Sequence, residues 1–253
     1  GLYLSYSDSN VIEGNISDNE RGVYLTHSRG NTIKNSTLIH NNYYGVYVEY
    51  GSYNEIRDCN VSLTYYDDGM YIYNSNDNVI ENCTLIGNAD CGVELSGSNN
   101  RIANCTIANN NNGIRINSGA GNSIEGNEIS DNNYKGIHVK SQYNTIAFNN
   151  VTNNDYGIYL QNSYNSIYLN NFINNAQQAY SSGVNTWKSF NASYEYEGNS
   201  YASYLGNYWS DYNGSDENGD GIGDTPYEID QNDKDHYPLV DPKECYENIT
   251  PVP

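Results

Sequence analysis

The chain is short of basic residues and of long apolar segments, and each shortage excludes a class of protein. Only 11 of its 253 residues are lysine or arginine, against 31 aspartate and glutamate residues, which gives a net charge of −20. So acidic a chain is not expected to bind nucleic acid, because the phosphate backbone would repel it. No apolar run reaches the roughly 18 residues that indicate a membrane-spanning helix. A signal peptide is also absent, so we expect a processed or trimmed form that begins at Gly1.

Helical patterns are missing as well, whereas short alternating segments recur through the first three-quarters of the chain. The recurring pattern is glycine, apolar, any, apolar, followed after a short gap by asparagine, any, isoleucine, with a period of 21–24 residues. The glycines that open the copies are Gly1, Gly22, Gly45, Gly69, Gly92, Gly113, Gly136 and Gly157. The matching asparagines are Asn10, Asn31, Asn54, Asn78, Asn100, Asn122, Asn144 and Asn165. A fixed period in this range is typical of a solenoid.

Stacking the copies turns each repeat position into a column. The position two residues after the asparagine is isoleucine in every copy: Ile12, Ile33, Ile56, Ile80, Ile102, Ile124, Ile146 and Ile167. Because β-branched residues suit the pleated interior of stacked strands, residues 1–175 are predicted to form an all-β, right-handed parallel β-helix of about eight rungs. The asparagine column itself predicts a ladder of side-chain amides at a tight turn.

Residues 176–253 lack the repeat and are rich in aromatic and acidic residues, so we expect an irregular C-terminal cap over the last rung. Within this cap, the segment 216–224 has the ligand spacing of a calcium-binding loop. The expected ligands are Asp216, Asn218, Asp220, the carbonyl of Ile222, and Asp224. The pattern departs from an EF-hand at its twelfth position, where Tyr227 replaces glutamate, so the alternative is an acidic turn that holds no ion.

One outward-facing column of the glycine-led strands contains candidate catalytic residues. Glu94, Arg115 and His138 occupy this column in consecutive repeats, and Lys140 lies in the next outward column. A polysaccharide lyase needs a base and a cation beside a carboxylate, whereas a glycosidase needs two facing carboxylates, and here that pair is missing. We favour the alternative, a surface ladder of salt bridges, and therefore predict that the protein is not an enzyme.

The same face carries a stripe of tyrosines, in a chain that has 28 of them. The stripe residues expected to bind a partner are Tyr24, Tyr47, Tyr71, Tyr73 and Tyr159. Three interpretations are open: stacking on sugar rings, packing between rungs, or an interface with another subunit. We favour the interface, because tyrosine is enriched at interfaces.

Five cysteines leave at least one thiol without a partner in the chain. Cys59, Cys83 and Cys105 share one column and are interpreted as small, buried, stacked thiols. Cys91 is expected at an exposed corner, where an oxidising environment would allow a disulfide with Cys245. If the protein is exported, the expected glycan acceptors are the late sequons at Asn191, Asn213 and Asn248.

The end of the chain carries a distinctive string of motifs. Residues 170–179 read NNFINNAQQA, residues 206–212 read GNYWSDY, residues 220–227 read DGIGDTPY, and residues 237–239 read YPL. This string resembles the end of NosD-like right-handed β-helix proteins, and the repeats resemble the carbohydrate-binding and sugar-hydrolase repeats of that group. The resemblance covers nearly the whole chain and implies an exported protein, often an archaeal surface protein. It does not extend to copper chemistry, because the chain has one methionine and four scattered histidines.

From these features we predict an extracellular structural protein of the cell surface that assembles with copies of itself into a layer, sheath or filament. The reasons are the first repeat without a visible cap, the tyrosine richness, the acidity and the lack of a convincing active site. The alternative is a β-helix that binds or cleaves a polysaccharide with the face that carries Tyr24 and His138. Calcium is the one expected ion.

Overall fold

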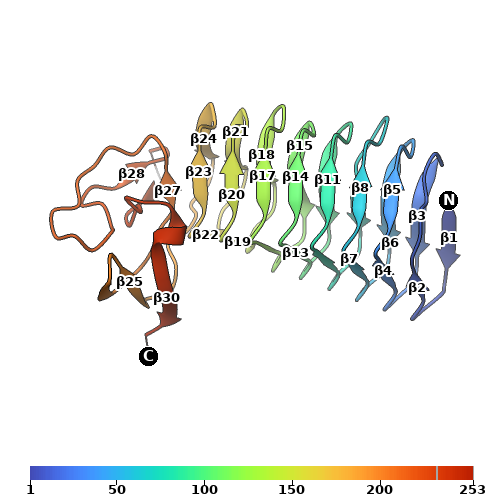
Figure 1. Cartoon of the computed structure of the whole chain (residues 1–253), viewed down its shortest axis with the longest axis horizontal. Coiled ribbons are helices and arrows are strands. Elements are labelled where there is room, and N and C mark those ends of the chain that lie inside the picture. Colours follow the sequence, from blue (N-terminus) through green and yellow to red (C-terminus); the bar gives the residue numbers. More distant parts are fainter. Residues whose placement is uncertain (232, 253) are drawn as a thin grey trace.

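A computed structural model of the protein describes residues 1–231 and 233–252, which form a stack of short strands closed at one end by an irregular cap (Figure 1). Successive turns of the stack contribute strands to three parallel sheets, here called sheets A, B and C. The predicted all-β parallel β-helix of about eight turns is confirmed. In the described part of the chain, no helix is long and apolar enough to cross a membrane.

The strands are short and follow each other at the repeat period. Sheet A contains β1 (Leu2–Ser5), β3 (Arg21–Thr26), β6 (Tyr44–Glu49), β9 (Met70–Tyr73), β12 (Cys91–Ser96), β15 (Asn112–Ser118), β18 (Lys135–Val139), β21 (Tyr156–Leu160) and β24 (Gln177–Ser181). Sheet B contains β2 (Val11–Ile12), β4 (Thr32–Lys34), β7 (Glu55–Arg57), β10 (Val79–Glu81), β13 (Arg101–Ala103), β16 (Ser123–Glu125), β19 (Thr145–Ala147) and β22 (Ser166–Tyr168). Sheet C contains β5 (Thr37–Ile39), β8 (Asn60–Ser62), β11 (Thr84–Ile86), β14 (Thr106–Ala108), β17 (Glu128–Ser130), β20 (Asn150–Thr152), β23 (Asn171–Ile173) and β27 (Tyr208–Trp209).

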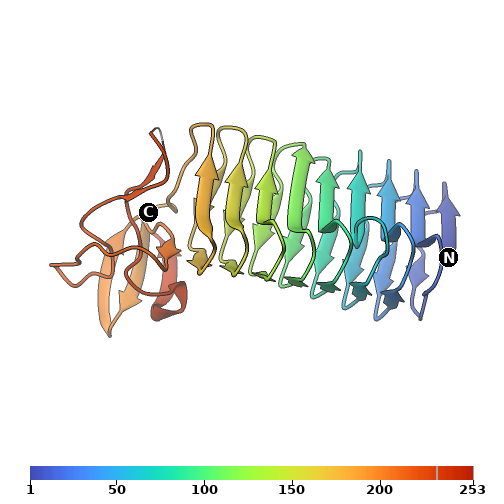
Figure 2. The ribbon, with the colours of Figure 1, turned by 90° about the horizontal axis from the view of Figure 1, so that it is seen from above.

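The cap combines a small antiparallel sheet, a hairpin and loops (Figure 2). Its elements are β25 (Ala192–Tyr196), β26 (Asn199–Ser203), β28 (Tyr227–Glu228), β29 (Lys234–Asp235), the 3-10 turn η1 (Lys243–Cys245) and β30 (Tyr246–Pro251). The solenoid continues past the expected boundary at residue 175, because β24 still pairs in sheet A and β27 pairs with β23 in sheet C. These two strands lack the repeat motif, so the pattern could not reveal them.

The interior consists of columns of identical or similar apolar side chains. All eight members of the isoleucine column are buried, from Ile12 at 6% exposure to Ile167 at 0%. Sheet C has an apolar column of its own. That column ends on larger rings, because Phe172 stacks on Trp209 with ring centroids 4.6 Å apart. Like therefore packs on like through the whole solenoid, and the aromatic end of the column fills the wider space under the cap.

Each of the three corners carries its own ladder of polar side chains, so the predicted asparagine ladder is one of three. Between sheets A and B, each asparagine donates its backbone N–H and its Nδ2 to Oδ1 of the next asparagine, as Asn54 does to Asn78 at 2.9 and 3.1 Å. The ladder between sheets B and C runs through Cys59, Cys83 and Cys105 and then through asparagines such as Asn127. A third ladder between sheets C and A includes Asn88, Asn110, Asn132, Asn154 and Asn175.

The ladders stabilise left-handed backbone at the corners. The residue before a ladder position repeatedly has positive φ, as in Asn99 (57°), Asn104 (53°) and Asn109 (56°). Even bulky residues such as Phe148 (60°) and Leu169 (53°) adopt it. Because this conformation is unfavourable for most side chains, the hydrogen bonds of the next residue must hold it in place.

Two ladders end in donors that have no further turn to bind. Buried carboxylates of the cap accept hydrogen bonds from these donors. Asn185 donates its N–H and Nδ2 to Asp233 at 2.9 and 3.2 Å. Asn207 donates the same two groups to Asp235 Oδ2 at 2.7 and 3.3 Å, and Trp209 Nε1 joins them at 3.1 Å. Burial raises the pKa of the Asp235 carboxyl to about 6, although these hydrogen bonds oppose the rise.

We predict that Asp235→Ala lowers the stability of the folded protein. The substitution would leave the donors of Asn207 and Trp209 buried without an acceptor, and each such group costs about 1–3 kcal/mol. We expect a loss of about 3 kcal/mol in the free energy of unfolding, seen as a lower Tm in a thermal melt. The exposed Asp155→Ala is the control, and equal melting temperatures for the two variants would contradict this role of the carboxylate.

Candidate functional site

The outward face of sheet A carries one continuous column of aromatic and charged side chains. In register from β1 to β24, the column contains Tyr3, Tyr24, Tyr47, Tyr71, Glu94, Arg115, His138, Tyr159 and Tyr180. The structure therefore places the candidates Glu94, Arg115 and His138 on the consecutive strands β12, β15 and β18. Lys140 follows β18 directly and is exposed.

Stacked tyrosines flank this charged centre on both sides. The ring centroids of Tyr24 and Tyr47 lie 4.9 Å apart, and those of Tyr47 and Tyr71 lie 5.5 Å apart. On the other side, Tyr159 stacks on Tyr180 at 4.3 Å. All five rings are half-buried, so the stripe packs between rungs and still presents ring surface to a ligand.

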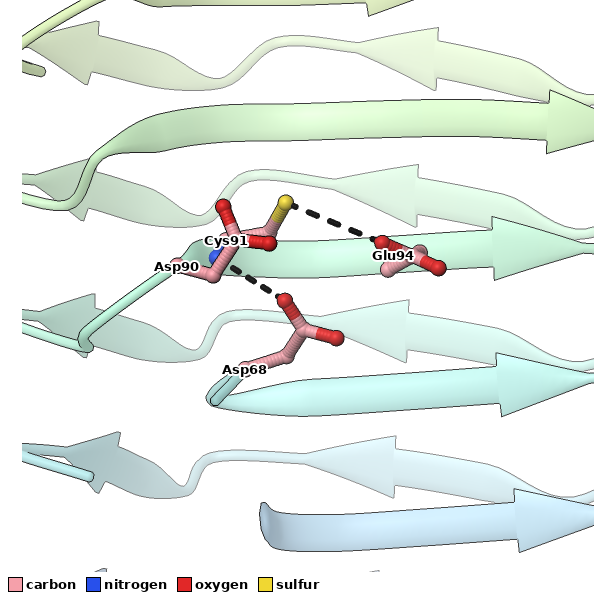
Figure 3. Close-up of side chains that lie close together, drawn as sticks. All are labelled: Asp68, Asp90, Cys91 and Glu94. Atoms are coloured by element: carbon pink, nitrogen blue, oxygen red, sulfur yellow. Dashed lines mark hydrogen bonds between the residues drawn. The ribbon is translucent and has the colours of Figure 1, made fainter. Parts of the chain in front are cut away.

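An acidic cluster forms where β12 begins, from Asp68, Asp90, Cys91 and Glu94 (Figure 3). The backbone N–H of Cys91 donates to Asp68 Oδ1 at 2.8 Å, which holds that carboxylate in a site only 2% exposed. Burial, followed by the nearby charge of Glu94, raises the pKa of Asp68 to about 8. This carboxyl therefore carries a proton at neutral pH.

Arg115 neutralises the outer side of the cluster. Its guanidinium donates to Asp90 Oδ2 at 2.7 Å and to Glu94 Oε2 at 2.5 Å. Burial opposes the charged form of Asp90, but the hydrogen bond and charge of Arg115 hold the pKa of that carboxyl below its usual value. Glu94 and Arg115 thus form the salt bridge that the sequence indicated, and the pair orients the side chains around it.

Two asparagine side chains complete the wall of the cluster. Asn112 Nδ2 donates to Asp90 at 3.1 Å, and Asn117 Nδ2 donates to Glu94 at 2.7 Å. The Oδ1 atoms of both are buried and have no hydrogen-bond partner among the described residues. Each amide therefore meets the carboxylates with its nitrogen, while its oxygen stays buried without a donor in the described part of the chain.

A set of cationic and basic side chains lies on the next strand, β18, and just beyond it. Within the described residues, neither Lys135 nor Lys140 forms an ion pair. The ammonium of Lys135 instead lies over the rings of Tyr134 and Tyr159, 4.2 and 4.1 Å from their centroids. In a chain with a net charge of −20, two cations without acidic partners indicate a place for an anionic ligand.

His138 lies between these two lysines in a neutral state. Burial, with the charges of Lys135, Lys140 and Arg115, lowers its pKa to about 4, although the hydrogen bond to Gln161 opposes the shift. His138 Nε2 is 2.8 Å from Gln161 Oε1, an acceptor, so the proton belongs on Nε2 and the lone pair on Nδ1. The imidazole is therefore available as a base well below pH 7.

The sequence did not single out Asp68, Asp90, Asn112 or Lys135. Asp68, Asn112 and Lys135 directly precede a repeat glycine or lie at the start of its strand, a position that we had treated as a corner. In the structure, strands β12, β15 and β18 begin there, at Cys91, Asn112 and Lys135. The available signal was that this column has tyrosine at positions 44 and 156 and, between them, Asp68, Cys91, Asn112 and Lys135 beside the Glu94 to His138 segment.

The cysteine expectations need correction. Cys91 is fully buried rather than at an exposed corner, because it is the first residue of β12 and its backbone is paired in sheet A. Cys91 and Cys245 are both free thiols, on the solenoid and in η1 of the cap respectively, so the predicted disulfide is not present. Cys59, Cys83 and Cys105 are buried and stacked as expected.

The predicted calcium loop lies in the cap with its ends at different depths, since Asp224 is exposed and Ile222 is buried. Its carboxylate oxygens bind the loop backbone. Asp216 accepts from the N–H groups of Gly219 and Gly221, both at 2.8 Å, and Asp224 accepts from Glu217 at 2.8 Å. Among the described residues, only the group Asp68, Asp90, Cys91 and Glu94 brings three or more carboxylate, thiol or imidazole ligand atoms within 4.8 Å. Calcium at the loop therefore stays a prediction, as does glycosylation of Asn191, Asn213 and Asn248, which are exposed.

Solved structures similar to this chain include two alginate epimerases and a phage tailspike. The A-module of the mannuronan C-5 epimerase AlgE6 of Azotobacter vinelandii is 16% identical, with a TM-score of 0.59 over 73% of this chain and 56% of its own. A variant of the periplasmic alginate epimerase AlgG is 17% identical, with a TM-score of 0.61 over 72% and 55% of the two chains. The tailspike of E. coli bacteriophage HK620, in complex with a pentasaccharide, is 13% identical, with a TM-score of 0.52 over 65% and 42%.

At this identity the likeness establishes the right-handed β-helix fold, and the chain spans just over half the length of either epimerase. The prediction that the protein is not an enzyme is nevertheless contradicted, because the similar structures include two enzymes that act on carbohydrates. No curated protein sequence matches the chain.

A protein-family model, described as periplasmic copper-binding protein (NosD), matches residues 1–102 and 61–214. Copper prefers thiolate, thioether and imidazole ligands, whereas the cluster of Figure 3 supplies three carboxylates and one thiol. Met70 is fully buried in the core, and His138 is outside the cluster, so the described residues do not fit a copper site. The two matches together span residues 1–214, well over half of the sequence, and the chain therefore belongs to the NosD family.

Proposed function

We propose that the protein binds an acidic polysaccharide along the outward face of sheet A and abstracts a proton from it there. The observation that carries this proposal is the set of Lys135, His138 and Lys140, a neutral base between two cations that have no acidic partner in the described structure. Tyrosines continue the face on both sides and offer ring surfaces for successive sugars. The similar solved structures include alginate epimerases and a tailspike in complex with a pentasaccharide, which supports a polysaccharide ligand.

The proposed step takes place at the carbon next to a uronate carboxylate. Lys135 and Lys140 bind the carboxylate, and His138 Nδ1 takes the proton from the adjacent carbon. The electron pair of the broken C–H bond spreads into the carboxylate group, where the two ammonium groups stabilise the added charge. Return of a proton to the opposite side would invert the carbon, whereas loss of the neighbouring sugar oxygen would cleave the chain.

The other parts of the cluster position these groups. Arg115 is held by Asp90 and Glu94, and it fixes the strand next to β18. Asn112 and Asn117 donate to the carboxylates of Asp90 and Glu94 and so help to hold them in place. The proposal replaces a self-assembling structural role, because the comparisons favour the polysaccharide alternative. We also propose that the protein is exported, since the family model and AlgG are both described as periplasmic.

We predict that His138→Gln abolishes turnover while leaving binding intact. Incubation of polymannuronate or polygalacturonate with the protein in D2O should place deuterium at C5 or generate unsaturated ends, both of which NMR detects. Loss of the base should lower this rate by at least about 100-fold. The control is His40→Gln, a corner histidine stacked on Tyr65. Unchanged exchange in His138→Gln, or no exchange or cleavage of either polymer by the unaltered protein, would refute the proposed step.

The low pKa of His138 leads to a second prediction, which concerns the pH dependence of turnover. The base must be unprotonated, and a pKa of about 4 keeps it so where an ordinary histidine, with a pKa near 6.5, would already be protonated. Turnover should therefore persist from pH 7 down to pH 5 and fall only as the pH approaches about 4. A rate that already halves near pH 6.5 would show that this imidazole is not the base.

We further propose that the loop around Asp216 and Asp220 binds calcium and stabilises the cap. Loop carboxylates at this spacing suit hard cations, and Tyr194 and Tyr201 donate hydrogen bonds to its carbonyls at Asp220 and Gly219. Chelation of calcium should lower the Tm, and Asp220→Ala should reproduce that loss. Asp8→Ala, in the first turn of the solenoid, is the control, and a melt that does not respond to the chelator would exclude a stabilising ion.

A further inference from the structure

A pocket of about 610 Å³ lies at the junction of the solenoid and the cap, away from the face of sheet A discussed above. Its walls come from the segment 184–188, which follows β24, from the hairpin β28–β29 and from the loop before that hairpin. This volume is within the range of small-ligand sites and suits one or two sugar rings. Nothing in the proposed chemistry of sheet A uses this pocket.

The wall of the pocket contains a buried donor that has no acceptor. Trp187 is only 3% exposed, and its Nε1 has no hydrogen-bond partner among the described residues. The other tryptophan, Trp209, is equally buried but donates to Asp235 at 3.1 Å. Since an unpaired buried N–H is costly, the indole of Trp187 indicates a ligand that brings an acceptor.

A second donor, Lys188, is also available. Its ammonium lies 3.9 Å from the ring centroid of Tyr204 and 5.3 Å from that of Tyr237, and it forms no ion pair with any described residue. Lys234, by contrast, is bound to Glu228 at 2.8 Å. Lys188 is therefore held in place by aromatic rings alone, with its hydrogen atoms free to bond.

The pocket wall carries charges of both signs. Lys188 and Lys234 line it together with Asp224 and Asp233, and Asp233 already accepts from Ser181 Oγ at 2.6 Å and from Asn185. The carboxylates disfavour an anion and the ammonium groups disfavour a cation, whereas a polyhydroxy ligand can donate to the former and accept from the latter. We infer that this pocket binds an uncharged sugar, with a hydroxyl oxygen accepting from Trp187 Nε1.

This inference is independent of the chemistry proposed for sheet A, because it concerns other residues and an uncharged ligand. Two-dimensional NMR of the ¹⁵N-labelled protein shows one indole N–H signal for each tryptophan, and Trp187→Phe assigns them. Titration with cellobiose, maltose, laminaribiose and chitobiose should shift the Trp187 signal and leave that of Trp209 in place for at least one sugar. Oligouronates should leave the Trp187 signal unchanged, even where they bind sheet A.

Variants then test whether Trp187 and Lys188 contribute to the free energy of sugar binding. Trp187→Phe keeps the ring but removes the donor, and Lys188→Met keeps the side-chain length but removes the charge, so each should weaken binding of the sugar at least tenfold. Lys34→Met, on sheet B where Lys34 pairs with Glu13, is the matched control and should bind as the unaltered protein does. A pocket that none of the four sugars enters, equal affinities in Lys188→Met and the control, or a Trp187 shift caused only by oligouronates would overturn the inference.

Discussion

Hydrogen bonds between side-chain amides of successive turns are the interaction on which the whole molecule depends. A solenoid turn of 21–24 residues must change direction three times, and each corner places a residue in left-handed backbone. The neighbouring amide reaches the next turn and satisfies both its own donors and the backbone of the corner, as Asn100 does with Asn122. Without these bonds, the buried polar backbone of every corner would lack partners.

The ladders also explain why one face can carry chemistry. Because they hold every turn in register, residues about 22 positions apart in sequence become neighbours in space, and a change at one repeat position appears as a change along a column. On sheet A the change from tyrosine to Glu94, Arg115 and His138 interrupts the aromatic column for three strands. Burial of the adjacent acidic cluster costs free energy, because its carboxylates lose their hydration. Arg115 and two amides offset that cost by binding the carboxylates.

The periodic features could be predicted from the sequence, and the others could not. The isoleucine column and the asparagine ladder repeat at a fixed interval, so their places followed from counting. Strands β24 and β27 have no repeat motif, so their pairing with β21 and β23 could not be counted from the period. Asp68 and Lys135 were missed because strand ends were taken for corners, and the low pKa of His138 depends on burial that no spacing reveals.

The ladders have a direction. In each, the amide nitrogen of one turn donates to the oxygen of the following turn, so the stack ends in unpaired donors, and the cap answers with Asp233 and Asp235. Insertion of a whole turn anywhere inside the solenoid leaves both of these end contacts unchanged, whereas insertion of one residue would turn the following strand inside out. The outward face of sheet A can therefore lengthen or shorten during evolution only in steps of one turn, about 4.8 Å each. The contacts between the solenoid and the cap stay the same at every length.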